Sequence, residues 1–304
     1  MAISRAQLVK ELEPGLNALF GLEYKRYDNQ HAEIYTNESS DRAFEEEVML
    51  SGFANANVKV EGSGVNYDQS QETYTARYTH DTIALAFAIT EEAIEDNLYD
   101  KISSRYTKAL ARSMSNAKQV KAAAPLNNGL PTVDGFDSGD GVSLFNTSHT
   151  TVSGTSVKNT LTTQADLNET SLEQALIDIA AFTDERGLRV AAKGMKMIIP
   201  SANQFAAERL LKSQGRTGTA DNDINAVRSM GMVPQGYRVN NFLTDSDSWY
   251  IITDCPNGMK MFTRAPLTTA MEGDFDTGNV RYKARERYSF GVSDYRGIFG
   301  VEGA

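Results

Sequence analysis

The stretch V-R-Y-K-A-R-E-R-Y-S-F-G-V, residues 280–292, alternates apolar and cationic side chains almost without interruption. Successive side chains of a β-strand point to opposite sides of the sheet, so the alternation predicts a long strand with two different faces. Only Glu286 interrupts the apolar face, which carries Val280, Tyr282, Ala284, Tyr288, Phe290 and Val292. The other face carries four cations, Arg281, Lys283, Arg285 and Arg287.

These four cations have two interpretations. A row of charges is most often a solvent-facing surface with local ion pairs. The alternative is that another chain, or an acidic segment of this one, covers the row. The first candidates for such acidic partners are Asp41, Glu45, Glu46 and Glu47.

Length and composition are those of an ordinary globular protein. The 304 residues suffice for one large domain or two of ordinary size, and the formal net charge is −10. This acidity disfavours tight, non-specific binding to nucleic acid. The longest apolar run, Ile83–Ile89, is too short to span a bilayer, and the N-terminus lacks the features of a secretory signal. We therefore expect a cytosolic product without membrane contact, and the lone Cys255 agrees because it cannot form an internal disulfide.

The first 79 residues are expected to be extended. Residues 1–45 are mixed and acidic and predict an arm with a short helix near Arg5–Leu12, outside any core. Residues 48–79 predict a long polar hairpin that turns at Gly62 and Gly64. An isolated pair of strands is marginally stable in water, so this molecule or a neighbour must support the hairpin.

A strand and a long helix are expected to follow. His80–Ile89 is apolar enough to lie in the core of a sheet. Thr90 is a candidate N-cap, and apolar residues then recur every three or four positions until Pro125. This spacing predicts a helical region of about 34 residues and roughly 50 Å. Such a helix would form the backbone of an elongated subunit.

The second half of the chain predicts a mixed α/β layer after an exposed loop at residues 127–159. Two capping signatures, Thr170–Glu173 and Ser201 with Gln204, mark helix starts, and a third short helix closes at Gly231. Three strands are expected at Met195–Ile199, Trp249–Thr253 and Met259–Phe262, the last two paired around a C-P-N-G turn.

Catalytic, metal and nucleotide motifs do not emerge from the sequence. The histidines His31, His80 and His149 are scattered, and no zinc spacing or phosphate loop occurs. Ser148 beside His149 invites a nucleophile and base interpretation, but no G-x-S-x-G elbow accompanies the pair. Asp134, Asp137 and Asp140 approach a calcium loop, yet their spacing of three suits tight turns better. We expect no catalytic residue, cofactor or metal site.

The order of these elements resembles that of a tailed-phage major capsid protein with the Hong Kong 97-like fold. Several segments are similar to those of the Mu-type major head subunit family: F-N-T-S-H-T (145–150), L-N-E-T-S-L-E-Q-A-L-I-D-I (167–179), F-T-D-E-R-G-L (182–188), A-A-E-R-L-L-K-S (206–213), G-T-A-D-N-D-I-N-A-V-R-S-M-G (218–231), D-C-P-N-G-M-K (254–260), D-F-D-T-G-N (274–279) and Y-K-A-R-E-R-Y-S-F-G (282–291). The resemblance covers about residues 45–300, whereas residues 1–44 carry little of it.

The resemblance implies an α+β fold with an N-terminal arm, an extended hairpin loop, a peripheral domain built on a long spine helix, and an axial α/β domain. The implied boundaries are 1–45 for the arm, 46–79 for the extended loop, 80–165 and 269–294 for the peripheral domain and its return strand, and 166–268 and 295–304 for the axial domain and its C-terminal segment. Some members of the wider fold crosslink a hairpin lysine, and Lys59 is the only lysine between residues 48 and 79.

The implied function is that of a head shell protein of a tailed double-stranded DNA phage, located in the virion capsid and assembled in the host bacterial cytoplasm. Its partners would be copies of itself in pentamers and hexamers, a separate scaffolding protein, a portal protein, a decoration protein and packaged DNA without sequence-specific contact. Two alternatives stay open: a cellular nanocompartment enclosing cargo enzymes, and a hydrolase using Ser148 and His149. The cationic face of residues 280–292 becomes a candidate seam between subunits, its apolar face packing on the spine helix.

Overall fold

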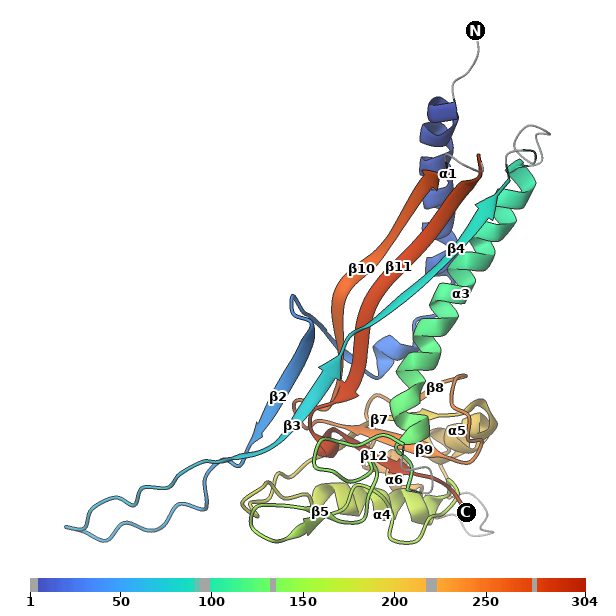
Figure 1. Cartoon of the computed structure of the whole chain (residues 1–304). Helices are drawn as coiled ribbons and strands as arrows, with labels where there is room; N and C mark the ends of the chain where they lie inside the picture. The colour runs from blue at the N-terminus through green and yellow to red at the C-terminus, as the bar shows by residue number, and fades with distance from the viewer. Residues whose placement is uncertain (1–4, 91, 93–98, 132–134, 217–222, 275–277) are drawn as a thin grey trace.

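The computed structural model describes residues 5–90, 92, 99–131, 135–216, 223–274 and 278–304. A long, narrow layer stands on a compact lower body (Figure 1). The long layer contains a sheet with the strand order β1 (Thr36–Ser39), β10 (Met259–Gly273), β11 (Val280–Val292) and β4 (Asp81–Ile89). The compact body contains a second sheet with the order β12 (Ile298–Val301), β9 (Trp249–Thr253), β7 (Gly194–Ile199) and β8 (Tyr237–Val239).

Strand β11 confirms the alternating pattern of the sequence. It pairs antiparallel with β10 on one side and with β4 on the other, so it is a central strand of the long sheet. The predicted apolar face is buried at Val280, Tyr282, Ala284, Tyr288 and Val292, and Phe290 is half-buried. Arg281, Lys283 and Arg285 are exposed on the other face, and Arg287 is half-buried. Glu286 is buried and accepts a hydrogen bond from Lys118 Nζ at 3.1 Å, and burial raises the pKa of its carboxyl.

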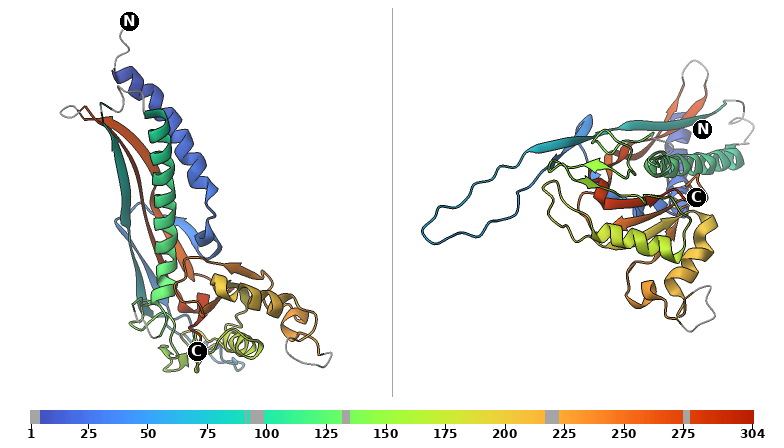
Figure 2. Two further views of the ribbon diagram at one scale, coloured as in Figure 1. Left: turned by 90° about the vertical axis from the view of Figure 1, so that its right-hand side faces the viewer. Right: turned by 90° about the horizontal axis from the view of Figure 1, so that it is seen from below.

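Two helices, α1 (Arg5–Arg26) and α3 (Tyr99–Asn128), cover the buried face of the long sheet (Figure 2). Their shared core contains Leu16, Phe20, Leu110, Ala111, Met114, Tyr282 and Ala284. The apolar face of β11 therefore packs on the spine helix, as predicted. The prediction of a short N-terminal helix outside the core is wrong. Leu16 and Phe20 are four residues apart, so one face of a longer helix buries both of them.

Helix α3 is the predicted spine helix, but it does not stop at Pro125. It continues to Asn128. Proline inside a helix lacks the backbone N–H and normally weakens or bends it. Here the final turn is held by burial, because Leu126 is fully buried in the main core and Leu130 follows it there. The helix start predicted after Thr90 falls within residues 91–98. Of these residues, the structure describes only Glu92.

The predicted hairpin is paired only at its base. β2 (Phe44–Leu50) and β3 (Glu72–Thr79) form an antiparallel pair, and residues 51–71 between them form an irregular loop that extends away from the body (Figure 1). Strands predicted near residues 57–67 are therefore absent, although the turn at Gly62 is present with a φ of 78°. Pairing persists where β3 rests on the long sheet, since Ala76 and Tyr78 pack with Phe262 of β10.

Strand β4 occupies an edge of the long sheet and not the core that its apolar sequence predicts. Most of its side chains are exposed, including Leu85 at 47%. The loop at 127–159 differs in the opposite sense, because Leu144, Phe145 and His149 within it are fully buried. It contains the short strands β5 (His149–Thr150) and β6 (Ser156–Val157).

The compact body is a mixed α/β layer, as predicted, but some of its helices begin at other residues than expected. Helix α4 (Glu169–Ala180) begins two residues earlier than expected, with a capping box formed by Asn168 and Ser171. The Ser201 signature lies in a short 3-10 turn, Ser201–Asn203, before α5 (Gln204–Lys212), without a side-chain cap. The short helix before Gly231, α6 (Ala226–Ser229), is present.

The expected pairing of residues 249–253 with residues 259–262 is wrong. β9 pairs with β7 and β12, whereas β10 leaves the compact body and pairs with β1 and β11. The chain changes direction at Asn257, whose φ is 59°. Further 3-10 turns lie at Gln30–Glu33 and Tyr295–Gly297.

Candidate functional site

The exposed cations of β11 form a stripe along the outer face of the long sheet. We call Arg281, Lys283, Arg285 and Arg287 the cationic stripe. Small residues of the edge strand β4 lie directly opposite, in the pairs Arg281–Ala88, Lys283–Ala86 and Arg285–Ala84. These alanines are exposed, so they leave the cations uncovered on that side. The result is a long, open cationic surface, flanked on the β4 side by small side chains, on which an extended segment could lie.

Two members of the cationic stripe have partners within the chain. Arg281 forms a salt bridge with Asp274, a residue just beyond the end of β10. Arg287 Nη2 donates to the carbonyl oxygen of Ala43 at 3.5 Å. Within the described residues, Lys283 and Arg285 form no ion pair. Contacts within the chain therefore involve both ends of the stripe and leave its middle, Lys283 and Arg285, open.

The acidic residues predicted as partners lie on and just before β2, and within one chain they have other contacts. Glu45 accepts a hydrogen bond from Ser40 Oγ at 2.6 Å. Glu46 lies 3.6 Å from Arg77 Nη1, and Glu47 lies 2.6 Å from Lys260 Nζ. Asp41 is exposed. The fold does not bring these carboxylates onto the stripe of the same chain, so the predicted pairing concerns two different chains.

A network of charges fixes the base of the extended loop to the long sheet. Lys260 Nζ also lies 3.1 Å from Glu38, so the lysine bridges β1, β2 and β10. Burial alone would lower the pKa of Lys260, but its hydrogen bonds to Glu47 and Glu38 raise it. The phenol of Tyr78 hydrogen-bonds the Ser293 hydroxyl nearby. This cluster could not be predicted from the sequence, because its members are far apart along the chain.

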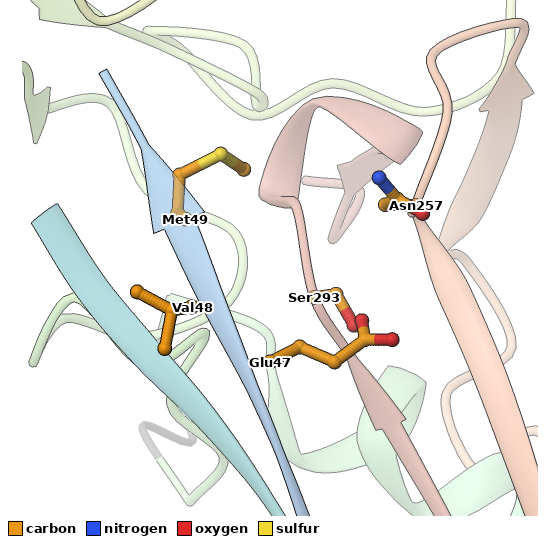
Figure 3. Close-up of a pocket in the computed structure, with 5 residues that line it drawn as sticks. All are labelled: Glu47, Val48, Met49, Asn257 and Ser293. Atoms are coloured by element: carbon orange, nitrogen blue, oxygen red, sulfur yellow. The ribbon is translucent and has the colours of Figure 1, made fainter. Parts of the chain in front are cut away.

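A hollow of about 270 Å³ lies beside this network (Figure 3). It is lined by Glu47, Val48 and Met49 of β2, by Asn257 of the turn before β10, and by Ser293 after β11. The carboxylate of Glu47 and the side chains of Asn257 and Ser293 face the same space (Figure 3). Polar groups from the loop base and from the compact body thus meet at one open site.

Asp68 links the two limbs of the extended loop to the compact body. Its carboxylate accepts hydrogen bonds from the backbone N–H of Ala54 at 2.7 Å and of Gln69 at 2.9 Å, joining both limbs of the loop. Arg186 of the compact body donates to it at 2.8 Å. These bonds, the Ala54 N–H first, lower the pKa of Asp68.

Beyond Asp68 the loop exposes apolar side chains. Val58 is 94% exposed and Tyr67 is 95% exposed, and Lys59 is exposed between Val58 and Val60. Such nearly complete exposure of apolar side chains on a projecting loop is typical of a surface that binds a partner.

The geometry of Ser148 and His149 does not support a nucleophile and base pair. His149 is fully buried, and its Nδ1 lies 2.6 Å from Asp140 Oδ2 while its Nε2 lies 3.0 Å from Asn159 Oδ1. The ring also stacks on Tyr295, with centroids 3.9 Å apart. The Ser148 hydroxyl instead accepts a hydrogen bond from Ser156 Oγ. Both ring nitrogens of His149 are occupied, so neither can take a proton from Ser148.

The aspartates considered for a calcium loop have other contacts where the structure describes them. Asp140 is engaged by His149 and Ser138, and Asp137 pairs its backbone with Ser143; Asp134 lies outside the described residues. No group of three or more His, Cys, Asp or Glu side chains that could hold a metal ion occurs among the described residues.

One charged feature escaped the sequence interpretation. Between Asp100 and Asp134 the chain contains no carboxylate, yet it contains Lys101, Arg105, Lys108, Arg112, Lys118 and Lys121. The apolar periodicity of this segment predicts a helix and its buried side, but says nothing about the charge of its exposed side. A count of charges over the same window would have revealed a strongly basic helix in an acidic protein.

Comparison with solved structures identifies the class of this fold. A subunit of the procapsid of bacteriophage JBD30 matches with a TM-score of 0.55 at 14% identity, covering 99% of this chain and 77% of that chain. A capsid subunit of an empty GTA particle matches at 0.54 and 15%, covering 91% of each chain. A virus-like particle from Pyrococcus furiosus matches at 0.54 and 11%, covering 95% and 98%. The chain has the Hong Kong 97-like fold of capsid subunits.

The sequence itself matches a protein family. The phage capsid protein family matches residues 73–301, which is most of the chain. No curated protein sequence matches. The chain belongs to the phage capsid protein family and is a major capsid shell protein.

Proposed function

We propose that this subunit assembles with copies of itself into pentamers and hexamers, which close into an icosahedral shell around the double-stranded DNA of a tailed phage. The observation that carries the proposal is the extended loop at residues 51–71. It exposes Val58 and Tyr67 almost completely, far from the core of its own chain. In closed symmetric assemblies each modest interface is repeated many times, so a loop lying on a neighbour adds area at every contact.

The proposed domains follow from the resemblance of the sequence. Residues 1–45 form the arm, 46–79 the extended loop, 80–165 and 269–294 the peripheral domain, and 166–268 and 295–304 the axial domain. One feature of the fold qualifies these limits, since helix α1 packs on the long sheet together with α3. The arm is therefore held on its own subunit, through α1 and through β1, which pairs with β10.

The seam between subunits is proposed to join the cationic stripe of one copy to Asp41, Glu45, Glu46 and Glu47 of another. Lys283 and Arg285 are exposed and have no ion pair within the described residues, so they are the cations most available to carboxylates of another copy. Exposed ion pairs contribute only about 0.2–1 kcal/mol each. Such pairs set register and orientation, while burial of the extended loop supplies most of the association energy.

The remaining partners and the setting are part of the same proposal. A separate scaffolding protein, a portal protein and a decoration protein would act with the shell, and assembly would take place in the cytoplasm of the host bacterium. Packaged DNA would be held without sequence-specific contacts. Across the described residues, no helix combines the length and apolar character needed to cross a membrane. Lys59 is exposed on the loop and accessible for contact with a neighbour.

We also propose that the chain catalyses no reaction, because the buried contacts of His149 have a structural explanation. His149 joins Asp140 of the loop at 127–159 to Asn159, and Asn159 Nδ2 donates to the carbonyl oxygen of Leu144 at 2.7 Å. A nanocompartment shell would use the same fold, so the cargo must separate the two roles. Co-purified enzymes would favour that alternative, and phage structural proteins would favour a phage head.

Electron microscopy of the purified full-length chain, alone and with the scaffolding protein, tests the proposal. Closed shells with pentameric and hexameric units are expected. Monomers and small oligomers under every condition would argue strongly against a shell. The presence or absence of nuclease-protected DNA inside particles from infected cells separates a phage head from a protein-filled compartment.

A further inference from the structure

Helix α3 is strongly basic in an otherwise acidic molecule. Six lysines and arginines and one carboxylate, Asp100, lie within Tyr99–Asn128, giving this helix a formal charge of +5. The whole chain carries −10, so the rest of the chain carries −15. Charge is therefore strongly segregated onto one element.

Three of these cations form a straight row along the exposed side of the helix. Arg105, Lys108 and Arg112 are separated by three and four residues, and all three are exposed. This spacing places them on one face of an α-helix within about 10 Å along its axis. Within the described residues, none of the three forms an ion pair or hydrogen bond through its side chain. We call them the helix row.

Two other lysines of α3 are already neutralised. Lys118 pairs with the buried Glu286 at 3.1 Å, and Lys121 pairs with Asp81 at 2.5 Å. The helix row thus differs from its neighbours along the same helix, because its charge is left for a ligand outside the chain.

The side chains beside the helix row indicate what kind of ligand it suits. Ala109, Ser113 and Asn116 next to it are exposed and small or polar, whereas Tyr106 and Val120 of the same helix are each 51% exposed. Protein interfaces are anchored by clusters of large apolar or aromatic residues at their centre. Tyr106 and Val120 lie about 21 Å apart along the helix axis and form no such cluster. Phosphate backbones need only cations and hydrogen-bond donors, without apolar anchors. The composition therefore favours a polyphosphate ligand over a protein.

We propose that the helix row binds the phosphates of double-stranded nucleic acid without reading its sequence. This inference rests on the proposed shell function, since it assigns the surface that meets the enclosed DNA. The helix row points away from the long sheet, and the cationic stripe lies on the sheet's opposite face. The helix side of the long layer therefore lines the lumen, and the stripe is left for neighbouring subunits.

Three phosphate contacts per subunit make a weak site. Each neutralised phosphate contributes about −0.9 to the slope of log K against log salt, so three give about −2.7. Affinity then falls about 40-fold between 50 and 200 mM salt. Many weak sites on one wall hold the outermost DNA layer in place and still release it when the genome leaves.

The test measures binding of a fluorescein-labelled, mixed-sequence DNA duplex to the unassembled full-length chain, by fluorescence anisotropy across this salt range. One variant is R105Q/K108Q/R112Q. Its matched control is R281Q/K283Q/R285Q, which removes the same three charges from the opposite face. Circular dichroism and the thermal midpoint of each variant confirm folding, and all six side chains are exposed. Polyglutamate of equal charge serves as competitor.

The expected result is that wild type and control bind alike, while the helix-row variant loses at least 10-fold in affinity at the lowest salt and most of its salt slope. Equal losses in both variants would overturn the proposal, because total charge would then explain binding. Competition by polyglutamate as strong as by unlabelled DNA would also overturn it and assign the row to an acidic protein. The shell function fails separately, if the wild-type chain forms no particles.

Discussion

Gly291 lies where the ring of Tyr78 crosses strand β11, and no larger residue fits there. A Cβ atom at this position would lie 2.6 Å from Tyr78 Cε1, and Tyr78 cannot retreat because it packs on Phe262 and hydrogen-bonds Ser293. We expect Gly291→Ala to cost about 1–3 kcal/mol of unfolding free energy, the usual range for overpacking. Chemical denaturation measures it. Gly273→Ala, where nothing lies within 4 Å, should leave stability nearly unchanged, and equal losses would contradict the explanation.

His31 gives the fold a dependence on pH. Burial lowers the pKa of His31 to about 4, and the nearby charge of Lys118 acts in the same direction. Gln119 Oε1 accepts the His31 backbone N–H, so its Nε2 donates to His31 Nδ1 at 2.9 Å. A proton on Nδ1 would place two donors face to face, and the folded state therefore favours the neutral ring.

The consequence of the lowered pKa has a definite sign. Below the unfolded pKa of about 6.5 the unfolded chain binds a proton that the folded chain refuses, so stability falls as the pH drops from about 6.5 to about 4. The loss is on the order of 2–3 kcal/mol. Unfolding free energies at pH 7.5 and 4.5 should converge between wild type and His31→Gln as the pH falls. A constant difference between them would disprove this role.

At the scale of elements, the extended loop should contribute to assembly and not to the stability of the subunit. Replacing residues 56–66 with a short glycine-serine linker leaves Asp68, Ala54 and Arg186 in place, so the base of the loop stays clamped. We expect the thermal midpoint to change by less than about 2 °C, since surface segments without core contacts contribute little. Shell formation in electron micrographs should be lost. Normal shells from this variant would remove the main support for the proposed function.

The elements that the sequence predicted well are those whose burial pattern is local. β11 was predicted because its alternating residues lie between two paired strands and under a helix, so every second side chain is buried. The spine helix was predicted for a similar reason. α1 was predicted too short, ending at Leu12 before Pro14, because its described buried residues, Leu16 and Phe20, are few and lie after the proline. The loop strands were overpredicted because strand-like composition needs support, and support depends on contacts distant in sequence.

The candidate site was only partly readable from the sequence for the same reason. The cationic stripe is contiguous in sequence and was found. The clamp of Asp68 by Arg186 and the bridge of Lys260 between Glu38 and Glu47 join residues far apart in sequence, so only the fold reveals them. The charges of the helix row can be read directly from the sequence, but the prediction for this helix used only the spacing of its apolar residues.

At the scale of the whole molecule, the cationic stripe and the acidic segment at residues 41–47 should make shell assembly sensitive to salt. Exposed charges are screened over about 8–10 Å at physiological ionic strength, so pairs across a seam weaken as salt rises. We expect the wild-type shell yield to fall between 0.05 and 0.5 M salt. K283Q/R285Q should assemble poorly even at low salt, whereas K283R/R285K, which keeps both charges, should behave like wild type. Light scattering and electron microscopy measure the yield.

Because both side chains are exposed, the unfolding midpoint of each subunit should stay within about 1 °C of wild type. Unchanged assembly of K283Q/R285Q at every salt concentration would exclude the stripe as a seam.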